Sequence, residues 1–309
     1  MESRKLIVTA SPHITNHTST RGLMLNVCIA LLPALVASTL IFGARALLVT
    51  GVTVAACVGF EALYCVVMKK PVPVGDFSAV VTGMILAFNL PATIPLWIAI
   101  IGAFVAIVVA KQLFGGLGFN FANPALLGRI VLFIGFAGRM TAYAFPQTDI
   151  DALASATPLV AGNSMAGKDM LLQLLLGAHG GVLGETCAVA LILGGIYLIA
   201  TKTISAAIPL SYIGTVAVLS LVLGQDVVLQ LFSGGLLLGA FFMATDYVTA
   251  PQTYWGRALF GIGAGLLTCL IRFYGSYAEG VSFAILFMNI LTPYLSRWTQ
   301  SKPLGGAKA

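Results

Sequence analysis

Long stretches without a charged residue constrain this chain more than any other feature of its sequence. Residues 23–44 carry no charge over 22 positions, and residues 77–110 carry none over 34, with one proline-containing break at 89–95. A helix of about 20 apolar residues crosses the hydrocarbon core of a bilayer, and helices satisfy their own backbone hydrogen bonds in lipid. These stretches therefore predict membrane-spanning helices.

The composition supports the same class. Hydrophobic residues make up 59% of the 309 positions, charged residues make up 8%, and the mean hydropathy is +1.00. Because roughly a quarter of the residues of a soluble domain are charged, this chain cannot cover its surface in water. We predict an all-α polytopic membrane protein with about ten transmembrane helices. The expected spans are 23–44, 46–68, 76–90, 94–112, 125–138, 185–201, 204–223, 227–245, 256–273 and 281–296.

Lys and Arg are divided unevenly between the two sides of this topology. With the N-terminus inside, 12 of the 16 fall on the cytoplasmic side, and the outer side holds Arg45, Arg139, Lys168 and Arg272. Because cytoplasmic loops are enriched in these residues, we expect a cell (inner) membrane protein with both termini in the cytoplasm. The same bias explains the net charge of +6, so the charge is no argument for nucleic-acid binding. The first 22 residues are mostly polar, and we expect no cleavable signal peptide.

The ten spans divide into two groups of five. Because five is odd, the two groups have opposite orientations, as in the inverted repeats of transporter folds. Phe114-Gly115 and Tyr274-Gly275 occupy matching places after the fourth and ninth spans. Short spans broken by Gly or Pro point to a site near the middle of the membrane, although Gly also simply permits close helix packing. The expected segments are a cytoplasmic N-terminal segment (1–22), a first transmembrane repeat (23–138), an extracytoplasmic loop (139–184), a second repeat (185–296) and a cytoplasmic tail (297–309).

Few polar side chains fall within or beside the spans. An ionisable group inside the bilayer costs about 2.5–3.5 kcal/mol on insertion scales, so Glu61 is a candidate for the ion path. Alternatively, Glu61 lies near the inner interface or pairs with Lys69. Asp246 and Arg257 lie in one connection, either as part of a site or as an ordinary solvated pair.

The positions of the cysteines and histidines indicate no metal cluster and no haem. The five cysteines lie within or at the edges of spans without a C-x-x-C pair, which is typical of small apolar filler. No histidine lies inside a span, so a haem held by paired histidines is not expected. We expect no iron–sulfur or other metal site and no catalytic side chain in this chain.

The outer loop contains the sequence Ala154-Ser155-Ala156-Thr157, followed by a proline. It resembles the flavin attachment motif of the RnfD/NqrB family, usually Ser/Thr-Gly-Ala-Thr, in its last two positions and departs from it in the first two. The resemblance extends along the chain, and the length of 309 residues favours the Rnf branch. Its other motifs are Ser11-Pro-His-Ile, Asn123-Pro-Ala-Leu-Leu-Gly-Arg129, Gly180-Gly-Val-Leu-Gly-Glu-Thr186 and Ala244-Thr-Asp246.

The resemblance implies a function. The RnfD subunit of the Rnf complex carries FMN on the last Thr of the motif, here Thr157 with Ser155 beside it, through a phosphoester that a separate flavin transferase installs. The complex passes electrons from ferredoxin to NAD⁺ and exports Na⁺ or H⁺. The partners implied are the Rnf subunits A, B, C, E and G, and the flavin-bearing RnfG passes electrons to this chain. The family also implies a non-covalent riboflavin, for which we expect a pocket near the inner side from Asn120, Asn123, Arg129, Asp246 and Arg257.

Two other functions fit the same pattern of spans. A cofactor-free carrier or channel for ions or small solutes also has ten spans in two inverted halves, and it would be colourless. A structural anchor for redox partners would tolerate a change of Thr157 without loss of activity.

Overall fold

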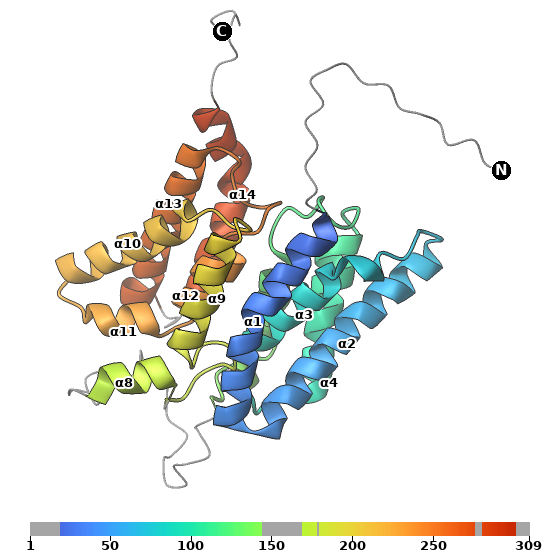
Figure 1. Ribbon diagram of the computed structural model, residues 1–309, viewed down its shortest axis with the longest axis horizontal. Helices are drawn as coiled ribbons and strands as arrows, with labels where there is room; N and C mark the ends of the chain where they lie inside the picture. The colour runs from blue at the N-terminus through green and yellow to red at the C-terminus, as the bar shows by residue number, and fades with distance from the viewer. Residues whose placement is uncertain (1–18, 144–168, 178, 276–279, 301–309) are drawn as a thin grey trace, which may run out of the picture.

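The computed structural model describes residues 19–143, 169–177, 179–275 and 280–300, and in these ranges every regular element is a helix (Figure 1). The all-helical class predicted from the sequence is confirmed. Before residues 144–168 the helices are α1 (Thr20–Phe42), α2 (Ala44–Val67), the 3₁₀-helix η1 (Val74–Asp76), α3 (Ser78–Phe88), α4 (Leu96–Phe104), the π-helix η2 (Val105–Gln112), α5 (Pro124–Gly135) and α6 (Ala137–Met140). After these residues they are α8 (Asp169–Leu176), α9 (Ala188–Ala200), α10 (Ala207–Val222), α11 (Val227–Phe232), α12 (Leu236–Leu238), the π-helix η4 (Gly239–Met243), α13 (Tyr254–Tyr274) and α14 (Val281–Thr299).

Three helices, α1, α2 and α13, are long and apolar enough to cross a bilayer. Shorter apolar helices of 10–17 residues are α3, α4 with η2, α5, α9 and α10. Large apolar side chains point outward from them, since Leu40 on α1 is 80% exposed and Leu221 on α10 is 72% exposed. Contiguous exposed apolar surface is unfavourable in water but matches lipid, so the outer faces of the helices fit a membrane.

One expected span, 227–245, is divided into three pieces. Helix α11 ends at Phe232, and Gly234 and Gly235 then take positive φ angles of 70° and 67° before α12 and η4 begin. Two successive left-handed residues cannot continue a right-handed helix, and glycine takes this conformation without steric cost. The prediction of one continuous span was wrong here because glycine within an apolar stretch was taken as helical. The break between α3 and α4, in contrast, lies at 89–95 as expected.

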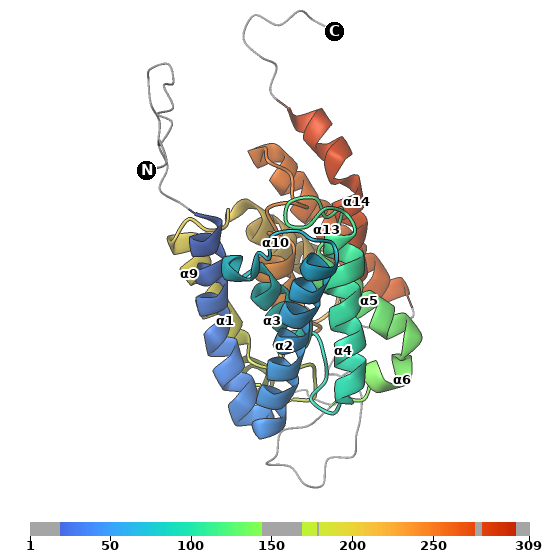
Figure 2. The same ribbon diagram turned by 90° about the vertical axis from the view of Figure 1, so that its right-hand side faces the viewer.

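The helices before residues 144–168 pack against one another, and so do the helices after them; the two groups also contact each other. Helix α2 packs against α3 and α4, while α13 packs against α10 and α14. The two groups are joined where α1 lies along α9 and where α5 meets α14 (Figures 1 and 2). Small residues allow the close approach of α1 and α9, because a Cβ atom at Gly194 would clash with the carbonyl oxygen of Ala30. Close packing through small residues is typical of membrane helices.

The two ends of the helix bundle hold different segments. Helix α1 begins and α14 ends at the same end, which is the upper one in Figures 1 and 2. Helices α6 and α8 lie at the opposite end (Figures 1 and 2). The described residues on either side of 144–168 are therefore at the end away from the start of α1.

Candidate functional site

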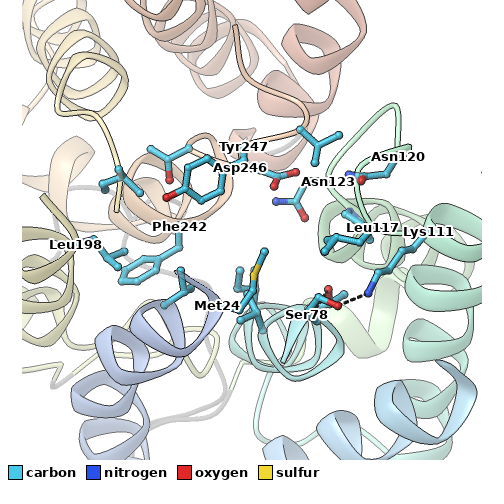
Figure 3. Close-up of a pocket in the computed structure, with 18 of the residues that line it drawn as sticks. Met24, Ser78, Lys111, Leu117, Asn120, Asn123, Leu198, Phe242, Asp246 and Tyr247 are labelled. Atoms are coloured by element: carbon cyan, nitrogen blue, oxygen red, sulfur yellow. Dashed lines mark hydrogen bonds between the residues drawn. The ribbon is translucent and has the colours of Figure 1, made fainter. Parts of the chain in front are cut away.

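A pocket opens between the two helix groups at the end of the bundle where α1 begins. Its empty space is about 790 Å³, including the part open at its mouth. Helices α1 and α3 contribute to one side, and α9, η4 and the residues after η4 contribute to the other (Figure 3). Its polar side chains include Ser78, Thr82, Lys111, Asn120, Asn123 and Asp246. Its apolar wall includes Met24, Leu198, Ile204, Phe241 and Phe242.

Three of the residues expected to form an inner pocket meet in its wall. Asn123 accepts a hydrogen bond from the Ala125 N–H at 3.0 Å and thereby caps α5, and its Nδ2 donates to the carbonyl of Met243 at 3.2 Å. Asn120 and Asp246 lie beside it (Figure 3). The structure brings Asn120, Asn123 and Asp246 together at one pocket, although Asp246 lies far from the other two along the chain. That they bind a flavin stays a prediction.

The Asp246 carboxyl lies in the connection after η4 and is surrounded by protein atoms. Burial raises its pKa above the ordinary value, because the charged form is poorly solvated there. Hydrogen bonds oppose this shift; the Thr249 hydroxyl donates to Oδ2 at 3.1 Å, and Asn120 contributes in the same direction. The carboxyl thus presents an acceptor to the pocket in either protonation state.

One residue of the wall, Lys111, belongs to a buried ion pair. The Lys111 ammonium lies 2.6 Å from Glu61 Oε1, and Gln112 Nε2 donates to the same oxygen at 2.8 Å. Lys111 also donates to the Ser78 hydroxyl at 2.6 Å (Figure 3). Glu61 is completely buried and Lys111 is 2% exposed. Glu61 therefore pairs with Lys111 and not with Lys69, and both side chains are buried among protein atoms.

The two expected arginines lie elsewhere. Arg257 donates through Nε to the carbonyl of Pro251 at 3.1 Å, and it borders a separate shallow pocket that shares Asp246 and Tyr247 with the first. Arg129 is buried in α5 and donates to the Ser282 hydroxyl at the start of α14. Arg129 therefore does not line the main pocket.

Lys111 and Ser78 are pocket residues that sequence reasoning did not identify. Lys111 was counted as a cytoplasmic charge because it follows directly on the uncharged stretch 77–110. The available signal was the position of Glu61, a lone acid in an apolar span that requires a partner. The sequence does not indicate which of the nearby lysines supplies it.

Comparison with known proteins identifies the family. The sequence model of the NQR2, RnfD, RnfE family matches residues 7–305. The chain belongs to this family. The D subunit of the Na⁺-translocating ferredoxin:NAD⁺ oxidoreductase complex of Acetobacterium woodii is 45% identical over 100% of this chain and 98% of its own length. The D subunit of the proton-translocating ferredoxin:NAD⁺ oxidoreductase complex of Clostridium ljungdahlii is 40% identical over 96% of each chain. The D subunit of the ion-translocating oxidoreductase complex of Stutzerimonas stutzeri is 37% identical over 93% of each chain.

In this member of the NQR2, RnfD, RnfE family, the motifs that carried the resemblance fall at both ends of the bundle. Asn123–Arg129 begins α5, and Ala244–Asp246 follows η4 at the pocket. Residues 180–186 join the two helix breaks at the opposite end. There the Gly184 N–H donates to the carbonyl of Phe88 at 2.8 Å, and the Gly234 N–H donates to Glu185. Thr157 and Ser155, on which the flavin attachment prediction falls, lie outside the described residues.

Proposed function

We propose that this chain is the RnfD subunit of an ion-translocating ferredoxin:NAD⁺ oxidoreductase complex, the Rnf complex. The observation that carries the proposal is similarity along the whole chain to relatives that are named as this subunit, including one at 45% identity. The apolar, outward-facing helices agree with a membrane subunit. The proposed partners are the other Rnf subunits, A, B, C, E and G, together with the lipid bilayer.

The names of the relatives leave the coupling ion of this chain open. The Acetobacterium woodii complex is named for Na⁺ and the Clostridium ljungdahlii complex for protons. Both relatives are similar to this chain over nearly its whole length, so the ion has to be measured.

The architecture that we propose is ten membrane-crossing segments in two inverted repeats, 23–138 and 185–296, with both termini cytoplasmic. It is supported by the packing of the helices within each group, α2 against α3 and α4 in one and α13 against α10 and α14 in the other. The chain is interrupted between α3 and α4 and between α11 and α12. An arginine donates to the backbone carbonyls of each break. Arg45 NH2 donates to Ile94 at 3.1 Å, and Arg272 NH1 donates to Gln230 at 2.7 Å. Irregular backbone at membrane depth requires such partners.

The pocket is proposed to hold a non-covalent flavin. Its wall fits the group, because apolar side chains such as Phe242 and Leu198 suit the faces of a flat ring, and Asn120, Asn123 and Asp246 suit its polar edge. Among the described residues that line the pocket, the one Lys or Arg is Lys111, which is already paired with Glu61. The wall therefore favours riboflavin over FMN, because a phosphate would lie near the Asp246 carboxylate without a free counter-charge. A flavin bound here supplies an electron carrier, which the side chains position and shield from water.

Thr157 is proposed to carry covalent FMN through a phosphoester, installed by a flavin transferase, with Ser155 beside it. The support is the match of Ala156-Thr157 to the family motif, together with membership of the family. The described residues that flank this loop lie at the end of the bundle away from the pocket. A bilayer core of about 30 Å is long for one electron transfer, so two carriers at opposite ends of this chain form a relay from RnfG back toward the cytoplasm.

The decisive experiment uses the whole complex in sealed vesicles, with reduced ferredoxin and NAD⁺ added. NADH formation and ion uptake are followed together, once with Na⁺ present and once without it. In Thr157→Ala we expect both rates to stop, while the control Thr141→Ala, an exposed threonine before the loop, retains them. Full electron flow in Thr157→Ala would contradict the relay.

A cofactor-free transporter or channel is the alternative, because broken helices and a buried ion pair also occur in such proteins. Intact-mass analysis of the chain, expressed with its flavin transferase, separates the two functions. We expect a mass increased by one FMN group. A colourless chain of unmodified mass supports the transporter.

A further inference from the structure

Lys111 lines the pocket and pairs with the buried Glu61, and the proposed electron relay assigns no role to either residue. Lys111 lines the pocket and donates to Glu61 and Ser78, both at 2.6 Å. An ammonium has three donors, so one N–H bond remains beyond these two. The flexible four-carbon stem allows the ammonium to move while the backbone stays in place.

The Glu61 carboxylate can accept more hydrogen bonds than it makes. Its Oε1 accepts from Lys111 and Gln112, whereas its Oε2 has no hydrogen-bond partner among the described residues, although the side chain is completely buried. A buried carboxylate oxygen without a partner is unfavourable. Oε2 can therefore bind one more cation or proton.

Hydrogen bonds connect this pair to the end of the bundle where α1 begins. Lys111 donates to the Ser78 hydroxyl, which in turn donates to Asp76 Oδ1 at 2.6 Å. Asp76 is only partly buried, in η1 at the start of α3. A chain of hydrogen bonds through Ser78 and Lys111 thus connects the partly buried Asp76 to Glu61.

We propose that Lys111 and Glu61 form a charge-exchange pair, in which an electron entering the pocket is matched by one cation bound at Glu61. The proposal rests on the proposed function, because it requires an electron carrier in the pocket. Lys111 turns toward the negative charge that appears there, and Glu61 takes up a proton, forming an O–H bond, or a Na⁺ ion. One electron and one cation enter together, so the net charge of the buried region stays constant. When the electron leaves, Lys111 returns to Glu61 and displaces the cation.

The physical reason is the cost of unpaired charge in a medium of low dielectric constant. Removing one partner from a buried ion pair is strongly destabilising, so an added electron and a departing ammonium must both be compensated. The π-helix η2 favours this arrangement, because it places Lys111 and the next residue, Gln112, on the same carboxylate oxygen. Such segments often occur at functional sites.

Other groups near the pair bear on its response to pH. Cys57 and Cys65 lie on α2 with Glu61, Asp76 is on η1, and Arg21 on α1 lies over the Phe77 ring at 5.5 Å. Asp246 faces the pocket from the other helix group. Of these, Asp76 and Asp246 are the other carboxyl groups near the pair, so the test includes a variant of Glu61 itself.

The test is a spectroelectrochemical titration of the non-covalent flavin in the purified complex. One series varies Na⁺ at fixed pH, and the other varies pH at fixed Na⁺, which distinguishes the two cations. In the native complex we expect the midpoint potential to rise with the cation that is taken up, by at most about 59 mV per tenfold change for one electron. In Glu61→Gln we expect the Na⁺ dependence to disappear, or the pH dependence to fall to that of the flavin ring alone. In Lys111→Gln we expect the equilibrium constant for one-electron reduction to fall at least tenfold, which lowers the midpoint potential by about 59 mV. Lys111→Arg should restore the native value. Lys70→Gln, an exposed lysine at the same end, leaves both unchanged.

Glu61→Gln and Lys111→Gln each leave one buried charge unpaired, so either could fail to assemble for that reason alone. The double variant Glu61→Gln with Lys111→Gln is therefore also measured, because it leaves no unpaired buried charge. We expect it to assemble, with a lowered midpoint potential, no Na⁺ dependence and only the pH dependence of the flavin ring itself. Native potential and native cation dependence in this variant would overturn the exchange pair. Absence of any acid-released flavin from the native complex would instead overturn the proposed pocket function.

Discussion

Asn123 is a single side chain that serves both the local backbone and the tertiary structure. Its side-chain oxygen Oδ1 caps α5, and its side-chain nitrogen Nδ2 donates to the backbone carbonyl of Met243 at the end of η4. Loss of an Asn cap costs about 0.5–2 kcal/mol, and here it would also separate two walls of the pocket. The Asn-Pro start of α5 is visible in the sequence, whereas the bond to Met243 exists only in the folded chain.

Thr157 permits a direct prediction at the residue scale. In the complex expressed with its flavin transferase, the band of this subunit should fluoresce under ultraviolet light on a denaturing gel, because a phosphoester survives detergent. Thr157→Ala should abolish the fluorescence while the protein still inserts, and Thr157→Ser should retain part of it through its hydroxyl. Fluorescence that persists in Thr157→Ala would place the attachment elsewhere.

At the scale of helices, the broken segments depend on partners from distant parts of the chain. The break between α11 and α12 exposes backbone carbonyls that no helix satisfies. Arg272, from the end of α13, donates to the carbonyls of Gln230, Ser233 and Gly234 at 2.7, 3.0 and 3.3 Å. The sequence shows an arginine at the outer end of a span, and only the fold assigns it to these carbonyls.

Arg272→Gln should therefore destabilise the protein, because a shorter neutral side chain cannot reach all three carbonyls. Hydrogen bonds to a charged group contribute about 1.5–3 kcal/mol, so we expect the free energy of unfolding to fall by about 2–3 kcal/mol. Arg139→Gln, an exposed arginine at the same end, is the control. The measurement is the thermal unfolding midpoint of the purified complex in detergent, and equal midpoints for the two variants would rule out this role.

The contact between α1 and α9 gives a second prediction for helices. A methyl group at Gly194 would strike the carbonyl of Ala30, whereas one at Gly214 on α10 meets no atom within 4 Å. Overpacking costs about 1–3 kcal/mol, so Gly194→Ala should lower the unfolding midpoint. Gly214→Ala should keep or raise it, because alanine favours helix. A native midpoint in Gly194→Ala would mean that α1 and α9 can separate without cost.

At the scale of the whole molecule, the two ends of the bundle differ in chemistry. The end that holds the start of α1 also holds the pocket and the exposed aromatic residues Tyr254, Trp255 and Trp298. Aromatic belts mark the interfaces of a membrane with water. The opposite end holds the helix breaks, with Arg45 and Arg272 on their carbonyls.

The orientation is tested by reporter fusions. A fusion at residue 165 should report the outer side, and fusions at residues 70 and 305 should report the cytoplasm, because most Lys and Arg lie on the side of the termini. A cytoplasmic signal at 165 would overturn both the orientation and the placement of the proposed FMN.

The sequence predicted the long helices well because they depend on length and apolar character alone. The expected span 46–68 corresponds to α2 at Ala44–Val67, and 256–273 corresponds to α13 at Tyr254–Tyr274. It predicted 227–245 poorly, because Gly234 and Gly235 break a helix only when tertiary contacts stabilise the exposed backbone. Of the residues expected to form one pocket, Asn120, Asn123 and Asp246 line the same pocket, whereas Arg129 does not, because its side chain points from α5 toward Ser282.

By itself, the sequence determined the membrane class, the family and the candidate flavin attachment residue, because hydropathy, charge bias and short motifs are local properties of the chain. Only the tertiary structure decided that Lys111 is the partner of Glu61, 50 residues away, and that Lys111 lines the pocket. The reason is that a buried charge selects its partner by distance and burial. In an all-helical chain, those depend on how distant helices pack against each other.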